Sequence, residues 1–188
     1  MNMVFLIAAG LVLTLVLERV LYISGITAYT YYLTDRRLKG FPNYKRKWQN
    51  QLFHGKITTD KARLVPAPTP HAMVSSCIYN VNKTPIRLKA IVPDGVYWSI
   101  AFHGRNQACY FTLNDIEARN QYGQEVEVVL TKSKKFYQAV GNEIVVAAPR
   151  LSRIGLILIR TIVMDPSNPD NINQVREIQK KAFIETVA

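Results

Sequence analysis

The sequence contains few of the residues that carry chemistry. Two cysteines among 188 residues are too few for a disulfide scaffold or for a zinc site made of cysteines alone. The motifs Gly-x-Gly-x-x-Gly, P-loop, His-Glu-x-x-His and Cys-x-x-Cys are missing. Nine glycines and nine prolines show no period, which excludes collagen-like and repeat architectures. We therefore expect no catalytic residue, no metal site and no cofactor.

Charge is scarce in the N-terminal region. Residues 1–17 contain no charged side chain, and a second uncharged run follows over residues 20–34. A membrane-spanning helix needs about 20 mainly apolar residues, so the sequence predicts a transmembrane anchor helix over residues 1–34. No Lys or Arg precedes Arg19, whereas a cleaved signal peptide begins with a basic segment. We expect a retained, single-pass anchor.

Glu18 and Arg19 are the two charges inside the predicted anchor. Adjacent residues on a helix do not face each other, so each needs its own partner or a position close to the lipid headgroups. An ionisable residue inside a membrane indicates a functional contact. Glu18 and Arg19 are therefore candidates for contact with other integral membrane subunits, and a position near the membrane interface is the alternative.

Positive charge is concentrated directly after the anchor. Residues 35–63 contain nine basic and two acidic side chains. We interpret residues 35–70 as a basic juxtamembrane collar followed by a proline-rich linker. An aromatic side chain there lies beside three basic ones, which is typical of contact with anionic lipid headgroups; the four are Lys45, Arg46, Lys47 and Trp48. The alternative is that Trp48 caps the core, and without a nucleic-acid motif we expect no nucleic-acid partner.

The remainder of the chain has the alternation of short β-strands. Apolar and polar side chains alternate over residues 84–92, 97–103 and 125–131. Residues 154–164 are nearly all apolar, which is typical of a central strand covered on both faces. An apolar face over residues 170–185 predicts a helix. The fold class is therefore mainly β: an antiparallel β-sandwich over residues 71–188 with a C-terminal helix.

The hairpin after residue 97 suggests where the cysteines lie. If its turn centres on Arg105 and Asn106, Phe102 lies opposite Cys109 and both point into the core. In an oxidising compartment Cys77 and Cys109 form a disulfide if their strands are neighbours. The alternative is that both are small buried core residues.

Ser99 and His103 share the outward face of one predicted strand, with Asp94 and Asp115 nearby in sequence. Four residues along a strand span about 13 Å, which is too far for the hydrogen bonds of a catalytic triad. The other two histidines, His54 and His71, lie far away in sequence. We interpret these side chains as strand and loop polar groups.

The segment Pro93-Asp94-Gly95 followed by Tyr97-Trp98-Ser99, and then Cys109-Tyr110-Phe111 with Asn114-Asp115, resembles a known pattern. It is similar to bacterial membrane-anchored proteins catalogued as domain of unknown function (DUF) 1254 and its companion DUF 1214. The resemblance covers roughly residues 72–168 and implies a β-sandwich tethered to the inner membrane, with the domain in the periplasm. The positive-inside bias favours the cytoplasm instead.

Two functions fit these features. The first is a non-catalytic accessory or structural subunit, in which the anchor packs against other spans of a larger inner-membrane assembly. The second is an envelope protein that binds a small apolar or lipid ligand inside the β-sandwich. A packed core favours the first, and an apolar cavity with converging polar groups favours the second.

Overall fold

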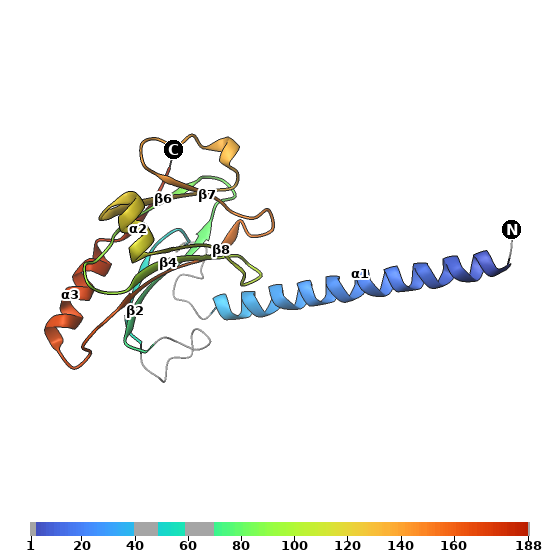
Figure 1. Ribbon diagram of the computed structural model, residues 1–188, viewed down its shortest axis with the longest axis horizontal. Coiled ribbons are helices and arrows are strands. Elements are labelled where there is room, and N and C mark those ends of the chain that lie inside the picture. Colours follow the sequence, from blue (N-terminus) through green and yellow to red (C-terminus); the bar gives the residue numbers. More distant parts are fainter. Residues whose placement is uncertain (1–2, 40–48, 59–69, 188) are drawn as a thin grey trace.

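The described part of the chain consists of a long N-terminal helix and two packed β-sheets with two shorter helices (Figure 1). The computed structural model describes residues 3–39, 49–58 and 70–187. The predicted collar residues Lys45, Arg46, Lys47 and Trp48, and most of the proline-rich linker, lie outside the described residues. The prediction of a mainly β fold with an N-terminal apolar helix and a C-terminal helix is confirmed.

Helix α1 (Met3–Leu38) has 36 residues, which corresponds to about 54 Å at 1.5 Å per residue. Its segment Ala9–Arg36 has a mean hydropathy of 1.7 and is exposed over residues 9–29, whereas Thr34, near the domain, is buried. By length and composition this segment is able to cross a membrane, a property that a signal sequence shares. The hydroxyls of Thr14 and Thr27 donate to carbonyls one turn earlier, so these side chains are satisfied without water.

The first sheet has five antiparallel strands in the order β1-β2-β8-β4-β5. The apolar run of β8 lies at the centre, between β2 and β4, as the sequence predicts. The strands are β1 (Phe53–Ile57), β2 (Ala72–Asn80), β4 (Trp98–His103), β5 (Cys109–Asn114) and β8 (Ile154–Ile162).

The second sheet has four strands in the order β7-β6-β3-β9. The pair β6–β7 is parallel, so the sandwich is not wholly antiparallel as expected. A connection of 12 residues between these strands, which contains a 3₁₀ turn, gives the chain the length to return to the start of β7. The elements are β3 (Ile86–Ile91), β6 (Glu125–Thr131), β7 (Ile144–Ala147), β9 (Phe183–Thr186) and the turn η2 (Lys134–Phe136).

The space between the sheets is filled by alternate side chains of the strands. In β4, Trp98, Ile100 and Phe102 are each at most 1% exposed, and their neighbours Ser99 and Ala101 are not fully buried. Helix α2 (Asp115–Tyr122) follows β5, and helix α3 (Pro169–Lys180) covers one end of the core. The alternation that predicts the strands is therefore also the pattern that forms the core.

Four elements differ from the sequence-based expectation: β1, α2, α3 and β9. Strand β1 pairs with β2, so the folded domain extends N-terminal of residue 71 into the expected collar and linker. The C-terminal helix ends at Lys180, and Phe183 belongs to β9, which pairs with β3. Helix α2 begins where the Asn114 side chain accepts from the Glu117 N–H. These short elements depend on partners distant in sequence or on a single cap, which periodicity does not reveal.

An ionic network covers the outer face of the second sheet. The Arg87 guanidinium contacts the carboxylates of Glu143 and Glu185, and the Tyr137 hydroxyl donates to Glu143. The Glu143 side chain is only 6% exposed. Burial raises the pKa of Glu143, but hydrogen bonds from Tyr137, Val140 and Arg87 outweigh burial and leave the pKa below its ordinary value of 4.5. The network ties β3 and β9 to the segment that leads into β7.

We predict that Glu143→Gln destabilises the chain by about 1 kcal/mol at pH 7. Because the folded-state pKa is depressed, the carboxylate stabilises the fold above pH 4.5 and loses this effect as the pH falls further. The difference between wild type and variant should therefore shrink as the pH falls below 4.5 in urea unfolding of the full chain in mild detergent. The exposed Glu125→Gln variant is the control, and an equal loss in both variants would contradict the prediction.

Candidate functional site

The candidate site is the end of the sandwich at which α1 joins, which we call the helix-proximal end. It consists of residues 81–85, 104–108, 131–132 and 148–153. These residues follow the ends of β2, β4, β6 and β7 and precede β3, β5 and β8. In Figure 1 the turn before β8 and the hairpin between β4 and β5 extend toward the side on which α1 lies. The strand directions bring these connections together although they are far apart in sequence.

Hydrogen bonds join the connections to one another. The Val81 N–H donates to the Arg153 carbonyl over 2.9 Å, and the Ala148 N–H donates to the Thr131 carbonyl over 2.8 Å. The Arg105 N–H donates to the Ser152 hydroxyl over 3.2 Å. The helix-proximal end is therefore a set of turns joined by hydrogen bonds, and the turns are not independent loops.

The Tyr79 hydroxyl supports these turns from the core. It donates to the Ser152 carbonyl over 2.7 Å and accepts from the Tyr110 hydroxyl over 2.9 Å. A Cβ at Gly155 would lie 2.4 Å from this hydroxyl, so a glycine is needed there. Burial raises the pKa of Tyr79 to about 12, with the bond from Tyr110 opposing the shift. Both phenols are neutral at physiological pH, and they act as structural hydrogen-bonding groups.

One side chain connects the domain to α1. The Arg105 guanidinium binds both carboxylate oxygens of Asp35, with Nε–Oδ1 at 3.1 Å and Nη2–Oδ2 at 2.5 Å. The guanidinium carbon (Cζ) of Arg105 lies 5.7 Å from the centre of the Tyr31 ring. A two-point Arg–carboxylate pair fixes orientation as well as distance, and the aromatic face adds a cation–π contact. Arg105 therefore holds the last turns of α1 against the β4–β5 hairpin.

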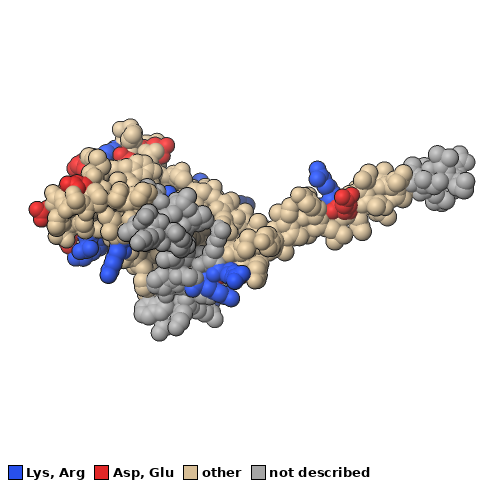
Figure 2. All heavy atoms as spheres, turned by 90° about the horizontal axis from the view of Figure 1, so that it is seen from below, with Lys and Arg blue, Asp and Glu red and all other residues tan. Residues whose placement is uncertain are grey.

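Glu18 and Arg19 lie together on the exposed surface of α1. Figure 2 shows an acidic and a basic side chain projecting from the middle of the helix. Glu18 is 17 residues from Asp35, or about 25 Å along the axis. Neither of them forms an ion pair within the described residues. Their role as contacts with other membrane subunits stays a prediction.

Cys77 and Cys109 are both free, and the possible disulfide between them is wrong. Strands β8 and β4 separate β2 from β5, which places the two cysteines about 14 Å apart, beyond the reach of a disulfide. A bulge between Phe102 and His103 also pairs Phe102 with Phe111. Cys109 is consequently exposed rather than in the core, whereas Cys77 is buried as expected.

The bulge places His103 and Cys109 directly opposite each other, a pairing that the sequence does not predict. Burial lowers the pKa of His103, and its Nδ1 lies 3.4 Å from the Gln107 carbonyl. Ser99 instead lies opposite Asn114 and Arg160. His54 lies in β1, which β2 and β8 separate from β4, and its Nδ1 is 2.9 Å from the Ser75 hydroxyl. Among the described residues no three His, Cys, Asp or Glu side chains converge on a metal site.

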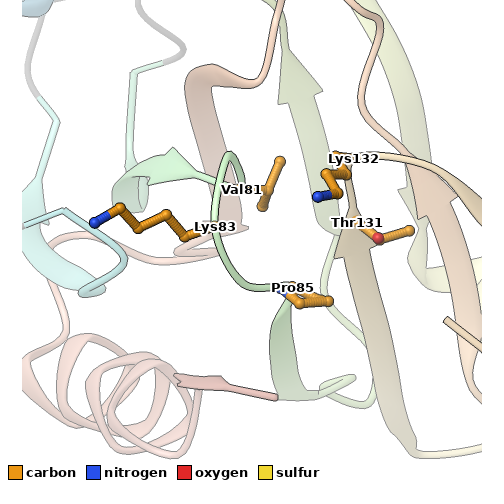
Figure 3. Close-up of a pocket in the computed structure, with 5 residues that line it drawn as sticks. All are labelled: Val81, Lys83, Pro85, Thr131 and Lys132. Carbon is orange, nitrogen blue, oxygen red and sulfur yellow. The ribbon is translucent and has the colours of Figure 1, made fainter. Parts of the chain in front are cut away.

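A small pocket opens at the helix-proximal end (Figure 3). Its volume is about 170 Å³, and it is lined by Val81, Lys83, Pro85, Thr131 and Lys132. Ligand pockets usually enclose roughly 300 Å³ or more. In Figure 3 the Lys83 side chain extends away from the other lining residues, so the two lysines do not converge on a common centre. The pocket suits a solvent-sized occupant better than a lipid.

The architecture defines a class: a β-sandwich of two sheets that carries a long apolar N-terminal helix. The family model described as "Protein of unknown function (DUF1254)" matches residues 49–186. The chain belongs to this family, and the resemblance found from the turn and strand motifs is confirmed. No curated protein matches the chain in sequence.

Two solved structures were compared with the chain, and the first is similar in fold. The VPA0106 protein from Vibrio parahaemolyticus has 14% identity and a TM-score of 0.60, over 86% of this chain and 37% of that protein. An uncharacterized protein from Burkholderia cenocepacia has 13% identity and a TM-score of 0.48, over 85% of this chain and 41% of that protein. The present chain therefore spans less than half the length of either protein, and the first likeness concerns the fold alone.

We predict that a maleimide reagent modifies one thiol per folded chain and two after unfolding, without prior reduction. Cys109 is exposed, whereas burial raises the pKa of the Cys77 thiol far above its ordinary range and shields it. Mass spectrometry of the full chain in mild detergent counts the adducts. The Cys109→Ser variant should remain unmodified when folded. Thiols that appear only after reduction would show that the disulfide exists.

We also predict that Arg105→Gln loosens α1 from the domain without unfolding it, since a partly exposed ion pair contributes about 1 kcal/mol or less. Spin labels on Tyr22→Cys and the native Cys109 should give a narrow distance distribution in wild type and a broader one in the variant. The charge swap Asp35→Arg with Arg105→Asp should restore the ion pair in reverse and make the distance distribution narrow again. Arg119→Gln, which breaks an ion pair with Asp94 away from α1, is the control. Equal broadening in both single variants would contradict the role of Arg105.

Proposed function

We propose that the protein is a single-pass, non-catalytic accessory subunit of a larger assembly in the bacterial inner membrane, with α1 as its span. The observation that carries the proposal is the pair of charged side chains on a helix that is otherwise uncharged and entirely exposed between residues 9 and 29. An apolar helix and two charges without described partners need other surfaces.

The depth of the charges follows from the position of Asp35. Segment Ala9–Arg36 has 28 residues, or about 42 Å, which matches a bilayer including its headgroup regions. With Arg36 among the headgroups, Glu18 and Arg19 lie about 25 Å further along the axis, inside or at the far boundary of the hydrocarbon layer. A charged side chain is unfavourable there without a partner. The partner in this proposal is a complementary side chain on a span of another subunit.

The domain supports an accessory role through its solid core. Trp98, Tyr79 and Phe102 are the largest buried side chains between the sheets, each at most 1% exposed, and they occupy the space that a ligand of the β-sandwich would need. Ser99 and His103 lie four residues apart on the same strand, β4, and Asp94 forms an ion pair with Arg119. These features favour a subunit that binds proteins over the alternative of an envelope protein that binds an apolar ligand.

The proposal places the domain in the periplasm, on the strength of the family resemblance. The exposed Arg36 and Lys39 at the end of α1 would by the positive-inside bias favour the cytoplasm. Long domains cross the membrane largely regardless of such charge. Protease added to intact spheroplasts should digest the domain if it faces the periplasm, and should leave it whole if it faces the cytoplasm.

The test of the accessory role is extraction of the native membrane in mild detergent, followed by sizing and mass spectrometry of the co-migrating chains. Wild type should migrate with other integral membrane subunits in fixed stoichiometry. The variant Glu18→Ala/Arg19→Ala should remain in the membrane, because its helix is more apolar, but should migrate alone. This result would tie the assembly to the charged pair.

The matched control removes an equivalent adjacent pair from the exposed face of α3, in Arg176→Ala/Glu177→Ala. It should co-migrate like wild type. If wild type itself runs as a detergent-bound monomer, the accessory role is wrong and the ligand-binding alternative gains. If both variants lose the partners equally, the contact does not lie at Glu18 and Arg19.

A further inference from the structure

The charged residues of the connections differ between the two ends of the sandwich. At the helix-proximal end, residues 81–85, 104–108, 131–132 and 148–153 contain no acidic residue. They contribute five basic side chains: Lys83, Arg105, Lys132, Arg150 and Arg153. The connections at the opposite end each carry an acid: Asp94, Asp115 and Asp165. Figure 2 shows both acidic and basic atoms on the end of the domain away from α1.

One apolar side chain stands at the tip of this basic end. Leu151 is 71% exposed. The Ser152 N–H donates to the Pro149 carbonyl over 2.7 Å, which closes a tight turn with Arg150 and Leu151 at its two central positions. Ser152 is itself held by Tyr79 and by the Arg105 N–H. The turn therefore presents an apolar side chain beside a cation on a rigid support.

The position of α1 indicates what this end faces. Arg105 binds Asp35, one residue before the end of segment Ala9–Arg36. If α1 spans a bilayer, Asp35 lies at the headgroups of one leaflet. The β4–β5 hairpin and the turn before β8 extend along α1 from there (Figure 1). Lys and Arg near an anionic leaflet are attracted to it, and a leucine beside them enters the interface.

We propose that the helix-proximal end is a second membrane-binding surface, which lies on anionic phospholipid with Leu151 inserted at the interface. The inference rests on the proposed role of α1 as a span. The occupant is a bilayer because the surface is continuous with the exit point of the helix and its net charge is opposite to that of an anionic leaflet. Arg105 connects α1 to this end of the domain: its guanidinium is paired with Asp35, and it lies beside the other four basic side chains.

The experiment compares hydrogen–deuterium exchange of the full chain in nanodiscs of phosphatidylcholine alone and in nanodiscs containing phosphatidylglycerol. Peptides covering 104–108 and 149–153 should exchange more slowly in the anionic discs, and high salt should remove the difference. Each basic residue near an anionic surface favours docking about fivefold. In the anionic discs, the variant Lys83→Gln/Arg150→Gln/Leu151→Ser should therefore exchange as fast as it does in the neutral discs.

The control Arg176→Gln/Lys181→Gln/Met164→Ser removes two charges and one exposed apolar side chain from positions away from the helix-proximal end. It should keep the slow exchange. Equal exchange in both discs, or equal loss in both variants, would overturn the lipid surface and leave the accessory role standing. Slowing by inorganic phosphate in neutral discs would also overturn it, in favour of a free-anion site. A chain that enters neither disc overturns the span itself and both proposals.

Discussion

The buried hydroxyl of Tyr79 determines how the helix-proximal end is built. A phenol that is 0% exposed must find hydrogen-bond partners inside the protein. It finds them in the Ser152 carbonyl and the Tyr110 hydroxyl, and this is possible because Gly155 leaves room beside it. Ser152 then receives the Arg105 N–H. Arg105, whose side chain binds Asp35, is thus connected to the core of the sandwich through Ser152 and Tyr79.

This chain of contacts makes α1 a part of the domain rather than a loose tether. A helix that pivots freely after the membrane would leave the orientation of the sandwich undefined. The two-point contact of Arg105 with Asp35, supported by Tyr31, instead sets the angle between helix and sheets. Because the pair is partly exposed, its energy is modest, and the lipid surface proposed for the same end would add to it.

The sequence predicts those parts of the structure that depend on local pattern. Alternation locates β3, β4 and β6, and the apolar run locates the central strand β8. It does not predict β1 or β9, which are strands because distant partners complete their hydrogen bonds, nor the bulge that turns Cys109 outward. Among the candidate contact residues, the sequence identifies Glu18 and Arg19, because they are the charged residues within an uncharged helix. The sequence does not identify the contact between Arg105 and Asp35, because 70 residues separate them and neither belongs to a motif.

The two charged features of the protein then depend on each other through the rigid length of α1. Between Glu18 and Asp35 the helix is continuous, so the distance of about 25 Å between them cannot change without bending it. If the sandwich rests on the leaflet through its basic turns, the height of Asp35 is fixed, and the depth of Glu18 is fixed with it. A partner subunit would then meet a charge at a defined level of the bilayer. In this arrangement, the rigid helix fixes the distance between the lipid contact of the domain and the protein contact of the helix.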